Sequence, residues 1–280
     1  MTRTLISVDE LAACNRDDML IVDCRFDLAD TSRGERNHAA GHIPGAAYAH
    51  LDNDLSTPDP RLGRHPLPSA ATFAHTLGRW GWRPGMPVIA YDDATGGIAA
   101  RLWWMMRLTG YSDVRVLDGG WAAWCTAGLP QDRKREEHTV RITAIDFDPR
   151  QVVYFDELQR LLRAPGTLLL DARDAARYRG ENEPIDPVAG HIPGARNRPF
   201  SDNLEGGRFK PADRLQEEFR NILGNHEPQD VIHSCGSGVT ACANLLAMEH
   251  AGLVGSRIFA PSWSGWIADP MRPIQAGEEP

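Results

Sequence analysis

The chain has 280 residues, of which 42% are hydrophobic and 24% are charged, and this length suits two globular domains better than one. A formal net charge of −8 argues against a nucleic-acid binder, because no basic stripe is available to replace the counterions of a phosphate backbone. The first residues lack a signal-peptide pattern, and no apolar run approaches the roughly 18 residues that span a bilayer. We therefore expect a cytoplasmic protein that contacts neither membrane nor nucleic acid, with its five cysteines reduced, since they lack metal-ligand spacing.

The first half of the chain alternates short apolar runs with helical patterns. Ser7 and Glu10 have the spacing of a capping box at the head of a helix, and Ser69 is the expected N-cap of an amphipathic helix. After the first helix, the patterns predict a strand over 19–23, a helix over 69–81, a strand over 87–91, a helix over 98–110, a strand over 114–118 and a short helix at 121–124.

The second half repeats this alternation. Its patterns predict a helix over 156–162, a strand over 167–171, a helix over 213–219, a strand over 230–234, a long amphipathic helix over 241–252 and a strand over 256–260. Short apolar β-branched runs separated by helices indicate buried parallel strands. We therefore predict an α/β fold of two tandem domains, each with a mainly parallel sheet and helices on both faces.

One sequence motif occurs twice. The segment AGHIPGA stands at 40–46 and again at 189–195, and the same order of neighbouring runs surrounds both copies. Such repetition indicates a duplicated domain of about 130 residues. We expect an N-terminal domain over 1–135, a linker over 136–150 and a C-terminal domain over 151–280. The alternating pattern within the linker predicts an extended segment packed on a domain face.

Cys235 stands directly after a predicted strand, at the edge of the sheet where open α/β folds bind ligands. Gly236 and Gly238 permit backbone angles that let successive amides curl toward one point, and the helix that starts near Val239 or Thr240 adds its positive end. Such a cradle favours an anion, so we expect the sulfur to be open to solvent and held as the reactive thiolate.

Two other interpretations of this loop are possible. Cys235 could be a buried structural cysteine, as Cys242 is expected to be, although its place between a strand end and a glycine turn argues against this. The loop could also serve a phosphatase of the Cys-x5-Arg type, but Ala241 stands where the phosphate-binding arginine is needed. A phosphatase is therefore disfavoured.

In these motifs the chain resembles the tandem-domain rhodanese family, which are sulfurtransferases of the thiosulfate and mercaptopyruvate class. The resemblance rests on the paired GHIPGA segments, the loop CGSGVT at 235–240, the tryptophan pairs at 121–124 and 263–266, and two strand-Asp-x-Arg segments, Asp23 with Arg25 and Asp171 with Arg173. It implies a catalytic C-terminal domain, a non-catalytic N-terminal copy with Asp92 in place of the cysteine, and no metal or organic cofactor.

The resemblance also implies a mechanism. The Cys235 thiolate would take the outer sulfur of a small-molecule donor as a persulfide, which a thiol, cyanide or sulfite then removes. Loop amides of Gly236, Gly238, Val239 and Thr240 would hold the anionic persulfide. Ser237 is the family's candidate for relaying a proton to the departing enolate, with His42 of the first GHIPGA segment behind it.

Two features of the sequence bear on the identity of the donor. The neutral loop CGSGVT favours 3-mercaptopyruvate, whereas loops of the thiosulfate type carry two cations. Arg177 matches the first of two arginines that clamp the donor's carboxylate, but the second position falls at Glu183-Pro184-Ile185. Without a substitute such as Arg179 or Arg198, carboxylate binding should weaken by about 1.5–3 kcal/mol. Thiosulfate therefore stays an alternative donor.

A different class of function also stays open. The chain could be a sulfur-relay module that hands its persulfide to a protein acceptor, with small-molecule turnover as a side activity. The loop around Cys235 would be the same in either case. Trp263 is a further candidate for lining the donor pocket.

Overall fold

The computed structural model of the chain describes residues 3–15, 18–134 and 138–278. The chain divides into two compact units. The first comprises Met1–Thr57, Leu67–Asp148 and Gly206–Phe209, and the second comprises Pro58–Pro66, Pro149–Glu205 and Lys210–Pro280. Residues 58–66 therefore fold with the second unit, although they lie in the first half of the sequence. The predicted domain limits stay a prediction, and positions 136 and 137 of the predicted linker lie outside the described residues.

The first unit is built on a five-stranded parallel sheet with the order β1-β5-β4-β2-β3. Its strands are β1 (Leu5–Ile6), β2 (Leu20–Asp23), β3 (Ala47–Tyr48), β4 (Val88–Tyr91) and β5 (Val114–Leu117). The residues of β2 and β4 are buried throughout, as the continuous apolar runs predict for strands covered on both faces.

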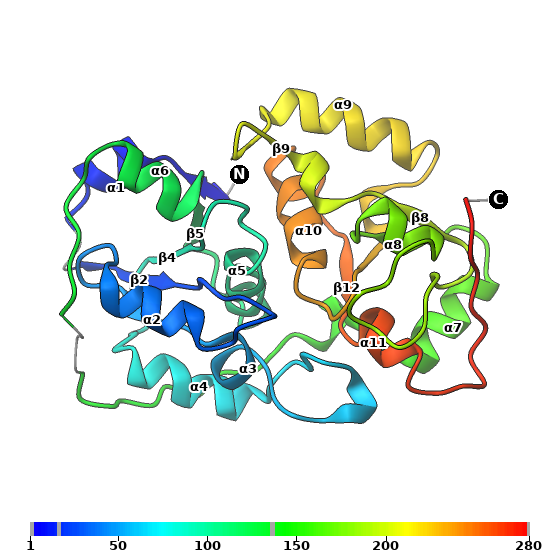
Figure 1. The fold of residues 1–280 in the computed structure, drawn as a ribbon, viewed down its shortest axis with the longest axis horizontal. Coiled ribbons are helices and arrows are strands. Elements are labelled where there is room, and N and C mark those ends of the chain that lie inside the picture. The colour runs from blue at the N-terminus through cyan, green and yellow to red at the C-terminus, as the bar shows by residue number, and fades with distance from the viewer. Residues whose placement is uncertain (1–2, 16–17, 135–137, 279–280) are drawn as a thin grey trace. The chain divides into compact units, whose positions relative to one another are not determined.

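Helices cover this sheet from both sides. They are α1 (Val8–Ala13), α2 (Arg33–Ala40), α3 (Leu51–Asp54), α4 (Ala70–Arg79), α5 (Ala99–Leu108) and α6 (Gly120–Thr126). In the first unit of Figure 1, α1 and α6 lie together on one side of β2 and β4, and α4 lies on the other. Val8, Leu11 and Trp124 form the core beneath α1 and α6 with Ile21 and Ile89 of the sheet.

The second unit repeats this architecture with the strand order β6-β12-β11-β7-β8, again parallel. Its strands are β6 (Val152–Val153), β7 (Leu168–Asp171), β8 (Ala195–Asn197), β11 (Val231–Ser234) and β12 (Arg257–Phe259). The equivalent order in both sheets confirms the predicted duplication and the α/β fold. Two further short strands, β9 (Leu204–Glu205) and β10 (Arg208–Phe209), lie outside these sheets.

Helices also flank the second sheet. They are α7 (Phe155–Arg163), α8 (Ala175–Arg179), α9 (Ala212–Leu223), α10 (Ala241–His250) and α11 (Ser262–Trp266), with 3-10 turns at Pro60–Leu62, Pro149–Gln151, Phe200–Asn203 and Pro228–Asp230. In Figure 1, α9 and α10 lie on one side of β12, and α7 and α11 lie on the other. Trp263 and Trp266 of α11 join the core between α7 and the sheet.

The helix caps confirm one sequence prediction, and the burial of α10 corrects another. Ser7 and Glu10 form the predicted capping box, and the Ser69 side chain accepts a hydrogen bond from the Thr72 amide. In contrast, α10 is not amphipathic, because residues 241–248 are all buried. Because the helix carries mostly small and apolar side chains on all of its faces, it packs against both α9 and the sheet. Among the described residues, no helix is long and apolar enough to cross a membrane.

The described part of the predicted linker packs on α4. Residues 138–148 form no strand. A Cβ added at Gly78 would lie 2.8 Å from the carbonyl oxygen of Arg141, and the rings of Phe73 and Phe147 lie 5.9 Å apart. The segment therefore lies close to the backbone of α4, as predicted for a linker packed on a domain face, but it forms no strand.

Candidate active site

The loop 235–240 joins β11 to α10 at the carboxyl end of the second sheet, where Thr240 is the N-cap of α10. Gly238 has φ 77°, and a Cβ there would lie 2.3 Å from the carbonyl oxygen of Ala260. Only glycine fits such a position without moving the backbone. Gly236 serves a different purpose, because a Cβ there would lie 2.9 Å from Nη2 of Arg64. It leaves space for side chains next to the cysteine.

The loop directs an amide at the sulfur of Cys235. The Gly238 amide donates a hydrogen bond to Cys235 Sγ at 3.1 Å. Cys242 makes the opposite contact, since its thiol donates to the Gly238 carbonyl at 3.5 Å. The Cys235 sulfur is thus an acceptor, whereas the Cys242 sulfur is a donor. Cys235 and Cys242 of α10 therefore differ in their hydrogen bonding, although both are buried.

Cys235 is 1% exposed, so the prediction that its sulfur is open to solvent is wrong. The start of α11 covers the loop, because the Trp263 amide donates to the Cys235 carbonyl and the Ser264 amide to the Gly236 carbonyl. Ser262 completes this cover. Its hydroxyl accepts from the Cys235 amide at 3.1 Å and donates to the Phe259 carbonyl at 3.0 Å.

Ser262 also adopts strained backbone geometry. Its φ of 51° makes it the one non-glycine residue with positive φ in the described part of the chain. Such a conformation costs free energy and persists where surrounding contacts hold it, which is common next to functional sites. Here the two hydrogen bonds of its hydroxyl hold the Cys235 loop and β12 together.

Ser237 forms a hydrogen bond with a histidine that the sequence analysis missed. Its Oγ lies 2.7 Å from Nδ1 of His65, and both residues are buried. His65 belongs to the segment 58–66, which folds with the second unit. The structure thus places His65 on the hydroxyl of Ser237, and the role of His42 behind that hydroxyl stays a prediction.

His42 lies in the first unit and is engaged there. Its Nδ1 donates to the His38 carbonyl at 2.7 Å, its ring stacks on His38 at 3.9 Å, and its amide donates to the Asp132 carbonyl. Its twin His191 makes the equivalent bond, from Nδ1 to the Tyr178 carbonyl at 2.8 Å. The histidine of each GHIPGA segment therefore fixes the backbone of its own unit.

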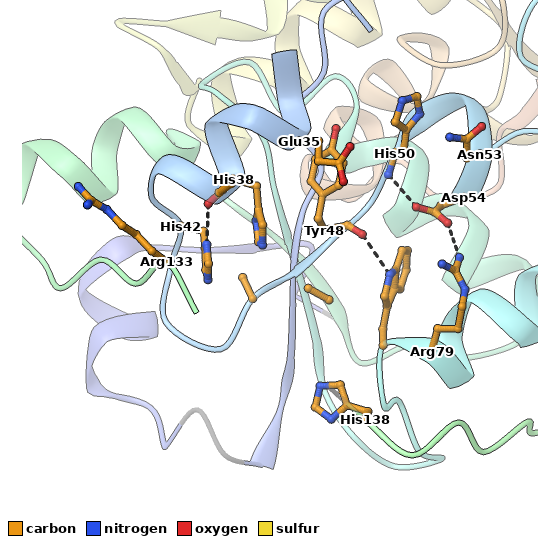
Figure 2. A pocket seen from close by; sticks show the side chains of 14 residues that line it. Glu35, His38, His42, Tyr48, His50, Asn53, Asp54, Arg79, Arg133 and His138 are labelled. Atoms are coloured by element: carbon orange, nitrogen blue, oxygen red, sulfur yellow. Dashed lines mark hydrogen bonds and ion pairs between the residues drawn. The ribbon is translucent and has the colours of Figure 1, made fainter. Parts of the chain in front are cut away.

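Figure 2 shows His42 among the residues that line a pocket of about 380 Å³ in the first unit. Several polar groups in this pocket bind one another. The Asp54 carboxylate accepts from the His50 amide and pairs with Arg79, and Trp80 Nε1 donates to the Tyr48 carbonyl. These bonds join α3, α4 and β3 along the pocket wall.

Two arginines border the loop at Gly236. The atoms closest to a Cβ added there are Nη2 of Arg64, at 2.9 Å, and Nη2 and Nη1 of Arg177, at 3.6 and 3.7 Å. Arg177, the predicted carboxylate ligand, thus lies beside the loop, and Arg64 of the segment 58–66 lies next to it. Arg179 instead pairs with the exposed Glu181, and Arg198 pairs with Glu218.

Two carboxylates hold these arginines. Asp186 bridges them, with Oδ1 paired to Arg64 and Oδ2 to Nη2 of Arg177 at 3.2 Å. Glu183 accepts from Nε and Nη2 of Arg177 at 3.1 and 2.8 Å and pairs with Arg173 Nη1 at 3.3 Å. Burial alone would raise the pKa of Glu183, but the hydrogen bonds from Arg177 and from backbone amides outweigh it and lower that pKa. Burial raises the pKa of Asp186 despite both arginines.

Arg173 lies beside Trp263, the residue whose amide holds the Cys235 carbonyl. It forms a bidentate ion pair with Asp171 and donates to the Gly190 carbonyl at 2.7 Å. Its guanidinium lies 4.8 Å from the ring centre of Trp263, which is fully buried and donates Nε1 to the Val188 carbonyl. Trp263 therefore supports this ion pair from the core, and its indole is not exposed to a pocket.

The first unit fills its equivalent loop with a carboxylate. Asp92 follows β4 at the position of Cys235, and its Oδ1 accepts from the Gly96 amide at 2.9 Å. Its Oδ2 accepts from the amides of Ile98 and Ala99 at 3.0 and 3.2 Å. The loop after this strand thus directs three amides at the Asp92 carboxyl group, and burial raises the pKa of that group despite them.

Comparisons with known proteins give the family. The rhodanese-like domain family matches the chain twice, over residues 7–127 and 155–269. A Pseudomonas aeruginosa protein named "Probable 3-mercaptopyruvate sulfurtransferase" is 46% identical over 281 residues, covering 98% of this chain and 98% of the relative. A Mycobacterium tuberculosis relative named "Putative thiosulfate sulfurtransferase SseB" is 36% identical over 282 residues, with 98% of each covered.

A solved structure gives the same result. The crystal structure of SseA from Escherichia coli, described as a 3-mercaptopyruvate sulfotransferase, superposes with a TM-score of 0.81 and 30% sequence identity. The match covers 94% of this chain and 99% of that chain. The family match and this superposition both extend over the two units, so the likeness is not confined to the loop around Cys235.

Proposed function

This chain belongs to the rhodanese-like domain family and is a sulfurtransferase, and from that premise we propose that it takes sulfur from 3-mercaptopyruvate as a persulfide on Cys235. The observation that carries the proposal is the hydrogen bond from the Gly238 amide to Cys235 Sγ. A sulfur that accepts an amide is prepared to be a thiolate, which is the nucleophile that sulfur transfer needs.

The first half-reaction moves one sulfur atom. The Cys235 thiolate attacks the donor sulfur, an S–S bond forms, and the donor's C–S bond breaks with its electron pair going to carbon. The leaving group is the enolate of pyruvate, and it becomes pyruvate when it takes up the proton that the persulfide sulfur gives up. Ser237, paired with His65 at 2.7 Å, is the hydroxyl that would relay this proton.

The second half-reaction returns the thiolate. A thiol, cyanide or sulfite attacks the outer sulfur of the persulfide, the S–S bond breaks, and its electron pair returns to Cys235 Sγ. The Gly238 amide then holds the released anion as it did before the cycle. We also propose that the reaction occurs in the reducing cytoplasm, which the five free cysteines support.

The donor's carboxylate needs a cation near the cysteine. Arg177 lies beside Gly236, and Arg64 lies beside it as well, in the role that the sequence left unassigned. Replacement of Arg177 by glutamine should raise the KM for 3-mercaptopyruvate by about tenfold or more, because a charge-assisted bond to the carboxylate is lost. The KM for mercaptoacetone, which has the same sulfur and ketone but no carboxylate, should not change.

Mass spectrometry tests the proposal directly. Incubation with 3-mercaptopyruvate should add about 32 Da, the mass of one sulfur, and Cys235→Ala should abolish both this gain and turnover. Cys14→Ala is the matched control, because Cys14 is a partly exposed cysteine of the first unit and should change neither. Faster labelling by thiosulfate would make thiosulfate the donor, and rapid release only to a protein partner would favour a relay. No mass gain with either donor would contradict sulfur transfer through Cys235.

A further inference from the structure

The site around Cys235 carries a carboxylate of its own between its two arginines. From this we propose that Asp186 occupies the binding position of the donor's carboxylate. A donor enters by displacing the Asp186 carboxylate from the two arginines. Asp186 and Arg64 thereby select donors with a single negative charge over dianions. The inference deepens the proposed function and rests on it for the identity of the donor.

The Asp186 carboxylate bridges Arg64 and Arg177. Each oxygen of Asp186 pairs with one arginine, Oδ1 with Arg64 and Oδ2 with Arg177. Both guanidiniums lie against Gly236, the residue after the nucleophile. The Asp186 side chain is 3% exposed, so it is held inside the site and not on its rim. A donor carboxylate held by the same two arginines would lie next to the sulfur of Cys235.

The charged side chains around Asp186 balance one another. Three arginines face three carboxylates: Arg64, Arg173 and Arg177 against Asp171, Glu183 and Asp186. Exchange of Asp186 for one monoanionic carboxylate keeps this balance. A dianion such as thiosulfate would add one unbalanced negative charge beside the Cys235 thiolate, and buried like charges repel strongly.

Asp186 is held by fewer hydrogen bonds than Glu183, the other carboxylate that contacts Arg177. Glu183 accepts hydrogen bonds from Arg177, Arg173 and the amides of Ile185 and Asp186. Asp186 accepts only from Arg64 and Arg177 in the described part of the chain. It also lies in the loop between α8 and β8, which has no helix or strand to restrain it. Asp186 is therefore the group that can move aside.

Arg64 is fixed through its backbone, whereas one nitrogen of its guanidinium lacks an acceptor among the described residues. Its amide donates to Ser264 Oγ at 3.1 Å, which fixes its backbone to α11. Its Nε is buried and has no hydrogen-bond partner among the described residues. A buried guanidinium nitrogen without an acceptor is costly, and an incoming carboxylate or its neighbouring ketone oxygen supplies one.

Ligand binding without turnover tests the exchange. Pyruvate and sulfate are titrated calorimetrically into protein that carries Cys235→Ser, with and without Asp186→Asn. We expect Asp186→Asn to tighten pyruvate binding about tenfold and sulfate binding by more, because both arginines lose their resident carboxylate. Glu205→Gln is the control, since it removes one charge from the exposed pair with Arg214 and should change neither affinity.

Turnover gives the second measurement. Asp186→Asn should lower the KM for 3-mercaptopyruvate and leave that for mercaptoacetone unchanged. Weaker or unchanged pyruvate binding would overturn the proposal, because Asp186 would then position the arginines or lie apart from the ligand. If Asp186→Asn does not fold, Arg64→Gln decides: it should weaken pyruvate binding about tenfold, and unchanged binding would overturn the proposal. The titrations decide the exchange even if 3-mercaptopyruvate is not turned over.

Discussion

Ser237 Oγ and His65 Nδ1 share a hydrogen bond of 2.7 Å beside the Cys235 loop. Because Ser237 is two residues from the nucleophile, this pair is placed to deliver a proton to a leaving carbanion. We predict that His65→Ala lowers kcat with 3-mercaptopyruvate by about 100-fold, the typical contribution of a positioned acid or base. Steady-state kinetics measure this loss.

The donor thiosulfate provides the internal control for this prediction. Its leaving group is sulfite, which needs no proton on carbon, so His65→Ala should affect thiosulfate turnover far less. Ser237→Ala should have the same effect as His65→Ala, and the double variant should be no slower than either, since the two act as a unit. Equal losses with both donors would show that His65 supports the loop structure and relays no proton.

The glycines of the loop should respond differently to alanine. In Gly238→Ala the new Cβ meets the backbone carbonyl of Ala260 at 2.3 Å in a conformation with φ 77°. Backbone strain alone should cost about 1–3 kcal/mol, and loss of the amide directed at Cys235 should abolish persulfide formation. Denaturant unfolding and mass spectrometry measure the two effects.

Gly236→Ala is the matched comparison. Its Cβ meets Nη2 of Arg64, the end of a flexible side chain, at 2.9 Å. The fold should therefore persist and persulfide formation should continue, while the KM for 3-mercaptopyruvate rises as Arg64 is displaced. Equal destabilisation by the two alanines would contradict the different purposes that the structure gives these glycines.

Sequence patterns predict the parts of this site that depend on near neighbours. The strand before Cys235, the glycine turn and the start of α10 all follow from a short stretch, and the repeat aligns Asp92 with Cys235. His65 and Arg64 could not be found in this way, because Ser237 and Asp186 lie 172 and 122 residues further along. No local period links such positions, since the return of segment 58–66 to the second unit sets their contacts.

The burial of Cys235 cannot be predicted from the sequence for the same reason. Its cover is the start of α11, where Trp263 and Ser264 donate amides to the loop carbonyls. The tryptophan helix is visible in the sequence, but its approach to the loop depends on the strained turn at Ser262. Helical and strand periods contain no information about that turn.

Asp92 should be a stability residue of the first unit. Its carboxylate accepts three amide hydrogen bonds at the start of α5, and Asp92→Ala leaves these buried donors without an acceptor. We predict a loss of about 2–4 kcal/mol in the free energy of unfolding, measured with denaturant. Asp113→Ala, at a half-exposed site of the same unit, should cost far less. An unfolding free energy for Asp92→Ala within error of the wild type would contradict the anion cradle.

The pH dependence of pyruvate binding should depend on Asp186. This side chain faces Arg64, Arg173, Arg177 and Glu183, and burial raises its pKa above the ordinary 3.8. As pH falls toward that raised pKa, Asp186 takes up a proton and releases the arginines, whereas Glu183, with its lowered pKa, stays ionised. In the Cys235→Ser background, pyruvate affinity should therefore rise as the solution is acidified, with net proton uptake on binding.

Asp186→Asn cannot take up this proton, so its pyruvate affinity should be higher at neutral pH and nearly independent of pH. Calorimetry in two buffers of different ionisation enthalpy measures the proton uptake of both proteins. If both show the same pH slope, the titrating group is another one, and Asp186 does not compete for the arginines. If only the protein with Asp186 takes up the proton, the carboxylate that holds Arg64 and Arg177 is the one that a donor must replace.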